Sequence, residues 1–153
     1  MENIKIDITI NGEKSTLNEN LIKQIKSFFT DNIICKKDIY GIKTKGDILR
    51  YHDIDICEFD KSCENLTKQE IAFRYLILAI KALNDGWKPN FNNPSQSKYY
   101  NSFQIYNGLF VFDATNYTYW VMCVPSALYL QDEKTAKYCK DNFFELYKEY
   151  YEI

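Results

Sequence analysis

The feature that most constrains the fold is a strongly apolar segment that starts at Thr67 and carries clear start and stop signals. Thr67 and Glu70 have the spacing of a helix capping box, and Gly86 stands where a left-handed residue ends a helix, with a proline three residues later. Apolar residues fall all round the helix axis rather than along one stripe, so the helix needs cover on most sides. The sequence therefore predicts a buried central helix over residues 67–85.

Shorter periodic patterns surround this helix. Isoleucines alternate with polar residues over residues 3–10, which predicts a half-buried strand. Helical spacing of apolar residues predicts amphipathic helices over residues 17–30 and 132–150. Two apolar runs joined by Asn107-Gly108 predict a hairpin within an antiparallel sheet built mainly from residues 102–124, which the first strand can join.

These elements predict a single α+β domain that spans residues 1–153. A chain of 153 residues is long enough to bury a continuous core without disulfides or a structural metal. In this fold the central helix packs on the antiparallel sheet, with helices from the N- and C-terminal parts of the chain on its flanks. Residues 31–66 show only short apolar pieces, which we interpret as further strands.

Composition excludes several classes of protein. A net charge of −2 argues against a protein whose affinity comes from general neutralisation of phosphates. The sequence shows no signal peptide and no apolar run of the roughly 20 residues that span a bilayer, so we expect a cytoplasmic protein with no membrane partner. Five widely spaced cysteines without close pairs are read as reduced thiols, mostly in the core.

The residues that carry most enzyme chemistry are sparse. His52 is the only imidazole, so any histidine-based catalysis would have to use it, and no nucleophile motif accompanies it. Asp53 and Asp55 would share one side of a strand and hold a hard cation, although such alternations are more often solvated faces. The five glycines form no nucleotide-binding loop. We therefore expect no catalytic site, metal or cofactor.

The candidate functional residues lie in an aromatic stretch that follows the central helix. Between residues 87 and 131 the sequence has only three charged side chains. Aromatic residues interleaved with lysine and amides can anchor a protein interface or stack on bases, whereas a tryptophan directly after a helix can simply cover its last turn. The candidate partner-binding residues are Trp87, Lys88, Lys98, Tyr99, Tyr100, Tyr117 and Tyr119. Lys98, Tyr99 and Tyr100 are the sharpest candidates among them.

A set of residues in the second half of the chain forms a recognisable pattern. They are Leu83, Asn84, Gly86, Trp87 and Pro89, then Lys98, Tyr99 and Tyr100, and near the end Phe143, Leu146 and Tyr147. This pattern resembles a loosely defined set of small uncharacterised proteins from phages and mobile elements of Bacteroidetes-type bacteria. The resemblance covers about residues 67–151 and brings no catalytic residue or ligand. It implies that the protein acts in a bacterial host cell by binding host or phage macromolecules.

The sequence thus leads to two functional hypotheses. The first is a small non-enzymatic binding protein that acts stoichiometrically on a protein or ribonucleoprotein, for example by inhibiting a bacterial defence nuclease in the manner of an anti-CRISPR. The alternative is a module that binds single-stranded nucleic acid, with Trp87, Tyr99 and Tyr100 as stacking platforms and Lys88 and Lys98 near the phosphates.

Overall fold

The computed structural model describes residues 6–10, 13–17 and 38–151, and the chain divides into two compact units, residues 1–37 and 38–153. The single domain over residues 1–153 therefore stays a prediction. The α+β class is confirmed, because the described part of the chain contains helices and antiparallel strand pairs.

The first unit contains a two-stranded antiparallel sheet. Strand β1 (Ile6–Ile10) pairs with β2 (Glu13–Leu17), with Ile6 opposite Leu17 and Ile10 opposite Glu13. The strand predicted over residues 3–10 is confirmed for its described part. It pairs with β2 rather than with the hairpin of the second unit. The helix predicted over residues 17–30 lies outside the described residues, apart from Leu17 at the end of β2.

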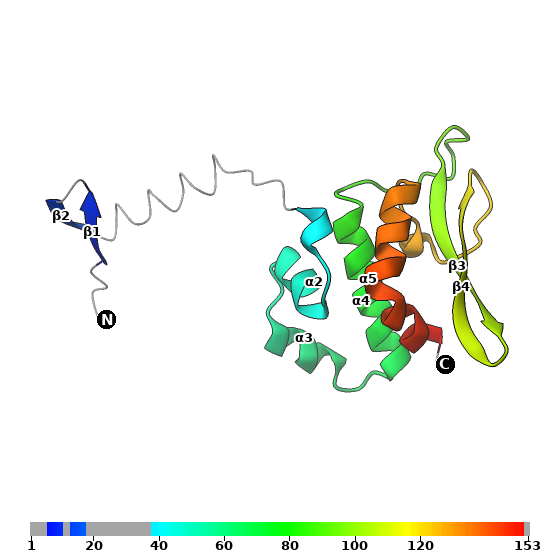
Figure 1. Cartoon of the computed structure of the whole chain (residues 1–153), viewed down its shortest axis with the longest axis horizontal. Helices are drawn as coiled ribbons and strands as arrows, with labels where there is room; N and C mark the ends of the chain where they lie inside the picture. Colours follow the sequence, from blue (N-terminus) through cyan, green and yellow to red (C-terminus); the bar gives the residue numbers. More distant parts are fainter. Residues whose placement is uncertain (1–5, 11–12, 18–37, 152–153) are drawn as a thin grey trace. The chain divides into compact units, whose positions relative to one another are not determined.

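The second unit consists of four α-helices and a hairpin, together with short 3-10 helices (Figure 1). Its α4 and α5 lie side by side, with α2 and α3 on one side of this pair and the β3–β4 hairpin on the other. The elements are η1 (Ile39–Gly41), α2 (Lys45–Tyr51), α3 (Ile56–Cys63), α4 (Lys68–Leu83), β3 (Lys98–Tyr106), β4 (Leu109–Thr118), η2 (Ser126–Leu128) and α5 (Glu133–Tyr151).

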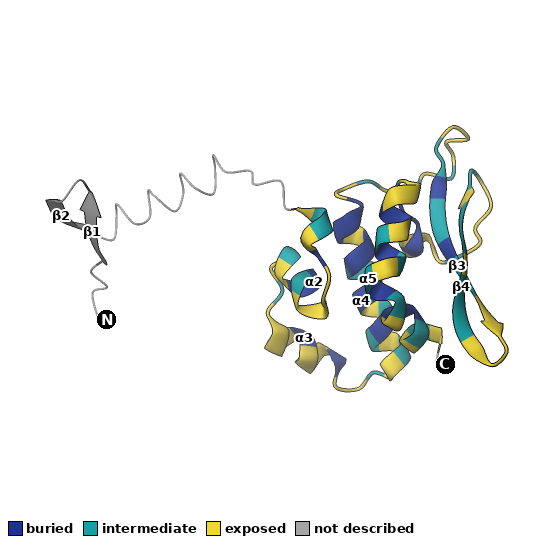
Figure 2. Cartoon of the chain, viewed as in Figure 1, coloured by how far each residue is buried: buried dark blue, intermediate teal, exposed yellow. Residues whose placement is uncertain are grey.

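The predicted central helix is confirmed as α4. The Thr67 hydroxyl accepts from the Glu70 amide at 3.2 Å, and the Glu70 carboxylate accepts from the Thr67 amide at 2.8 Å, so the capping box is complete. The chain leaves α4 through two left-handed residues, Asp85 at φ 43° and Gly86 at φ 88°. Figure 2 shows buried residues along α4 and α5. The α4 residues in the core are Ala72, Tyr75, Leu76, Ala79, Ile80, Ala82 and Leu83.

The predicted hairpin is confirmed with its turn. Asn107 and Gly108 take φ values of 52° and 77°, the conformation in which a two-residue turn matches the twist of its strands. The sheet meets the helices chiefly through α5, where the Phe103 ring of β3 packs against the Tyr147 ring in a tilted arrangement with centroids 4.6 Å apart. The helix predicted over residues 132–150 is confirmed as α5, and it carries a kink at Phe143.

The strands expected between residues 31 and 66 are wrong for the described part of that segment, which forms α2 and α3. Thr44 and Asp47 make a second capping box for α2. The Asp55 carboxylate accepts from the amides of Cys57 and Glu58 at 2.9 and 3.0 Å and so starts α3. These short polar caps override the weak apolar alternation, because they satisfy backbone amides that a helix start leaves without partners.

The sheet prediction over residues 102–124 is also wrong at its C-terminal end. Strand β4 ends at Thr118, and no strand follows before α5 in this described part of the chain. An isolated bridge instead pairs Tyr99 with Leu130, so β3 contacts the segment that leads into α5. The bulky residues at positions 119–124 thus belong to an irregular segment rather than to a central strand.

The described helices are too short or too polar to cross a bilayer. Among the described cysteines, Cys63 and Cys139 are buried and Cys57 and Cys123 are exposed, all as free thiols. The expectation that the cysteines are mostly core residues therefore holds for two of these four.

Candidate functional site

The most exposed apolar side chains of the described protein include a continuous run just after β4. We call residues 119–124 the aromatic loop. Trp120, Val121 and Met122 are 66%, 53% and 69% exposed, and Tyr117 at the end of β4 is 57% exposed. Consecutive large apolar residues held in water at this level are typical of interaction surfaces, since burying them against a partner is favourable.

Aromatic rings connect the aromatic loop to the sheet in a continuous row. Tyr99 and Tyr117 are partners in the strand register, and their ring centroids lie 5.7 Å apart. Tyr117 contacts Tyr119 at 5.6 Å, and Tyr119 contacts Trp120 at 5.7 Å. These distances are in the range of favourable aromatic pairs. Three of the predicted partner-binding residues, Tyr99, Tyr117 and Tyr119, are therefore brought together.

One fully buried side chain, Tyr129, fixes the backbone of the aromatic loop through hydrogen bonds. The Tyr129 hydroxyl accepts from the Cys123 amide at 2.7 Å and from the Val124 amide at 3.4 Å, and it donates to the Val121 carbonyl at 3.3 Å. The Thr118 hydroxyl also accepts from the Val121 amide at 3.0 Å. An apolar surface on a loop that is already ordered loses less conformational entropy when it binds.

Lys98 fixes the other end of the loop and does not face solvent. Its side chain is fully buried, and its ammonium donates to the carbonyls of Gln96 and Tyr119 at 2.8 Å and of Asn93 at 3.4 Å. The ammonium also lies over the Phe91 ring, 5.1 Å from its centroid. All three donors of the ammonium are occupied, so Lys98 stabilises the loop rather than presenting a charge to a partner.

Tyr100 lies apart from the aromatic row. Neighbouring residues of a strand point to opposite faces, so Tyr100 faces away from Tyr99 and contacts Tyr129 edge to face at 5.8 Å. A hydrogen bond with the Cys123 side chain, followed by burial, raises the pKa of Tyr100 to about 12. Tyr100 thus contacts the aromatic loop at Cys123 rather than joining the row of rings.

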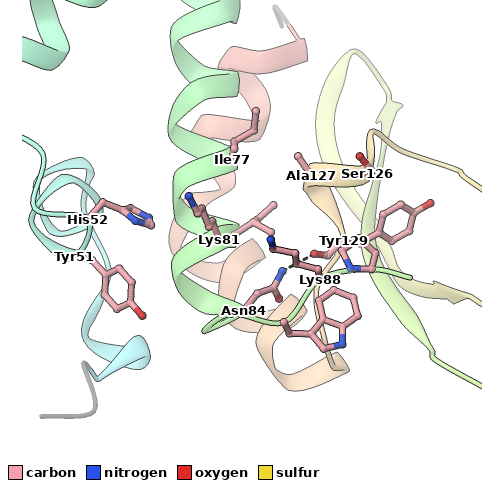
Figure 3. A pocket seen from close by; sticks show the side chains of 13 residues that line it. Tyr51, His52, Ile77, Lys81, Asn84, Lys88, Ser126, Ala127 and Tyr129 are labelled. Atoms are coloured by element: carbon pink, nitrogen blue, oxygen red, sulfur yellow. Dashed lines mark hydrogen bonds between the residues drawn. The ribbon is translucent and has the colours of Figure 1, made fainter. Parts of the chain in front are cut away.

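Trp87 and Lys88 line a separate pocket of about 370 Å³ between the end of α4, the end of α2 and the segment around η2 (Figure 3). Trp87 is half-buried and Lys88 is exposed. The Trp87 amide donates to the Asn84 carbonyl at 2.8 Å, which fixes it directly after the helix. Trp87 thus partly covers the end of α4 and partly forms a pocket wall. The other lining residues are Tyr51, His52, Ile77, Ile80, Lys81, Asn84, Gly86, Pro89, Ser126, Ala127 and Tyr129.

His52 has a structural contact in this pocket. It caps the C-terminus of α2, and its Nε2 lies 2.8 Å from the Leu78 carbonyl, which can only accept, so Nε2 carries the proton. Figure 3 shows the imidazole directed toward α4. Asp53 takes a left-handed φ of 54° and Asp55 caps α3, so the two do not share a strand face. The described residues contain no cluster of three or more metal-ligating side chains.

Sequence reasoning does not place Trp120, Val121, Met122 or Tyr129 among the candidate partner-binding residues. The first three fall in the sheet predicted over residues 102–124, and Tyr129 lies beyond it. A signal was present, because Pro125 follows the run closely and the strand pattern has no polar face. A strand of this kind at the edge of a small sheet exposes an apolar face to water.

Comparisons with known proteins found no relative of this chain. No protein-family model, no curated protein and no solved structure matches the chain.

Proposed function

We propose that this protein is a non-enzymatic binding protein whose aromatic loop occupies a surface of another protein. The observation that carries the proposal is the exposed run Trp120, Val121 and Met122 on a backbone fixed by Tyr129 and Lys98. Tryptophan, tyrosine and methionine are enriched at the centres of protein interfaces, where they contribute most of the binding energy.

A protein partner fits this surface better than a nucleic acid. Residues 99–131 contain a single charged side chain, Asp113, which is acidic. The nearest lysine in the strand, Lys98, is committed to backbone carbonyls. Single-stranded nucleic acid needs cations along its backbone as well as stacking rings, and only the rings are present at the aromatic loop.

Affinity capture with matched variants tests the proposal. Wild-type protein at micromolar concentration should retain a partner from bacterial lysate, and Trp120→Ala/Met122→Ala should lose it by at least about tenfold. Both side chains are exposed, so the thermal midpoint should not change. The control is Ile105→Ala/Leu109→Ala, which removes equally exposed apolar residues at the hairpin tip. Equal retention by the two double variants, or no retained partner, contradicts the proposal.

The partner class is tested separately. A bacterial defence nuclease is the partner that the resemblance to phage proteins implies, so stoichiometric addition of the protein should inhibit a purified nuclease of this kind, and the Trp120→Ala/Met122→Ala variant should not. The alternative, single-stranded nucleic-acid binding, draws on the row of rings from Tyr99 to Trp120. Anisotropy with labelled oligonucleotides at two salt concentrations detects it, because such binding weakens with salt.

A further inference from the structure

The pocket beside Trp87 has the properties of a small-ligand site. Its lining includes no residue of the aromatic loop, although Tyr129 both lines the pocket and holds the backbone of the loop. Its volume of about 370 Å³ lies within the range of known ligand pockets, roughly 300–1,000 Å³. Apolar side chains form most of its walls, among them Ile77 and Ile80 on α4 together with Pro89 and Ala127. Such walls favour an apolar ligand body.

The charged side chains that line the pocket are both positive. Lys81 comes from the last turn of α4 and Lys88 from the loop after it, and Figure 3 shows Lys88 extending back toward α4. None of the described residues that line the pocket carries a carboxylate. Asp85 lies next to the lining, and its carboxylate accepts from the Tyr51 hydroxyl at 3.4 Å. Among the described lining residues the charged side chains are therefore those of two lysines, which favour a ligand with one negative group.

The walls of the pocket are fixed before any ligand binds. The buried Asn84 side chain donates to the Tyr129 carbonyl at 2.8 Å and accepts from the Gln131 amide at 3.1 Å, which joins the end of α4 to the η2 side. The His52 contact with the Leu78 carbonyl holds the α2 side in the same way. Gly86, at φ 88°, has open space where a side chain would stand. A pre-formed cavity of this kind retains its shape without a ligand.

We infer that this pocket binds a small organic anion, with its apolar body between Ile77, Ile80 and Trp87 and its carboxylate at Lys81 and Lys88. The lysines are exposed, so they provide preference for the anion rather than most of the affinity. The ligand site is independent of the proposed protein partner, because its anion-binding residues lie outside the aromatic loop.

Trp87 fluorescence provides a direct test. The chain has two tryptophans, so Trp120→Phe leaves Trp87 as the only one. In this background octanoate and 3-phenylpropionate should change the emission saturably, and their neutral amides should bind about fivefold more weakly. Lys81→Gln/Lys88→Gln should reduce carboxylate affinity about fivefold and leave amide affinity unchanged. Lys61→Gln on α3 is the matched control.

A second variant tests the position of the ligand body. Ala127 lies in the pocket wall and is exposed, so Ala127→Phe fills the pocket with little effect on the fold. It should abolish the response to both carboxylates. The inference is overturned if neither carboxylate gives a saturable response up to about 10 mM, if the amides bind equally well, or if Ala127→Phe binds like its parent. A failure here leaves the capture experiment on the aromatic loop unaffected.

Discussion

The ammonium of Lys98 donates a 2.8 Å hydrogen bond to the carbonyl oxygen of Tyr119, which ties the start of β3 to the loop that follows β4. The same ammonium also holds the carbonyls of Asn93 and Gln96. One buried cation therefore organises two irregular segments, and the exposed aromatic loop depends on it for its conformation.

Lys98→Met should keep the volume of the side chain and remove its donors. Three backbone carbonyls then lose a partner, so the free energy of unfolding should fall by about 2 kcal/mol or more. Urea denaturation followed by circular dichroism measures this loss. Lys88→Met is the control, because its exposed side chain should change the stability by no more than about 0.5 kcal/mol. Equal stability of the two variants would show that the Lys98 contacts are not needed.

Tyr129→Phe should loosen the aromatic loop while the fold persists. The variant removes the hydroxyl that contacts the Cys123 and Val124 amides and the Val121 carbonyl, at a cost of about 1–2 kcal/mol. Hydrogen exchange at the Cys123 and Val124 amides should become faster, and partner affinity should fall although every exposed apolar side chain remains. Tyr106→Phe, at an exposed tyrosine, is the control. Unchanged exchange at both amides would contradict the role given to Tyr129.

Asn84→Ala should destabilise the junction between α4 and the segment before α5. It leaves the Tyr129 carbonyl and the Gln131 amide without their side-chain partner in a buried place, so we expect a loss of about 2–3 kcal/mol. Thermal or urea unfolding measures it. Asn92→Ala, in the exposed part of the loop after α4, should remain within about 0.5 kcal/mol of wild type. Similar losses in the two variants would rule out a special role for Asn84.

Stability should fall at alkaline pH through Cys139. Burial raises the pKa of this thiol from 9.0 to about 12, although its hydrogen bond with Tyr147 acts in the opposite direction. Below pH 9 both the folded and unfolded states hold the proton. Above pH 9 the unfolded state releases it first, so the free energy of unfolding should decrease by up to about 1.4 kcal/mol per pH unit. Burial also raises the pKa of Tyr147, which adds to the loss above pH 10.

The measurement is the pH slope of the free energy of unfolding, obtained from urea titrations between pH 8 and pH 10. Cys139→Ala should flatten this slope above pH 9, whatever its effect on stability at pH 8. Cys57→Ala, at an exposed thiol, should keep the wild-type slope. Identical slopes for wild type and Cys139→Ala would contradict the assignment.

The sequence predicts an element correctly where a strong local signal coincides with an apolar pattern that the fold buries. The α4 helix combines a capping box at Thr67 with apolar residues all round its axis, and the hairpin combines Asn107-Gly108 with flanking apolar runs. Each of these elements is decided by residues close together in the chain. The α2 and α3 helices are short, so the caps at Thr44 and Asp55 are their clearest sequence signals. The weak apolar alternation of the same segment favoured strands instead.

The candidate site was only partly accessible from sequence. Aromatic content identified Tyr99, Tyr117 and Tyr119, which the structure does place in one row. It could not show that Lys98 faces inward, because the three carbonyls that hold it come from segments on both sides of the hairpin. The exposure of Trp120 likewise depends on where β4 ends, at Thr118, whose hydroxyl accepts from the Val121 amide.

The isolated bridge between Tyr99 and Leu130 has a consequence for the order of folding. The Tyr99 amide donates to the Leu130 carbonyl at 3.0 Å, and the Leu130 amide donates to the Tyr99 carbonyl at 2.8 Å. The β3–β4 hairpin closes around a two-residue turn and can form on its own, whereas this bridge has to close the whole hairpin and the aromatic loop into a ring. The bridge should therefore close after the hairpin has formed, so that the aromatic loop acquires its fixed shape later than the strands beside it.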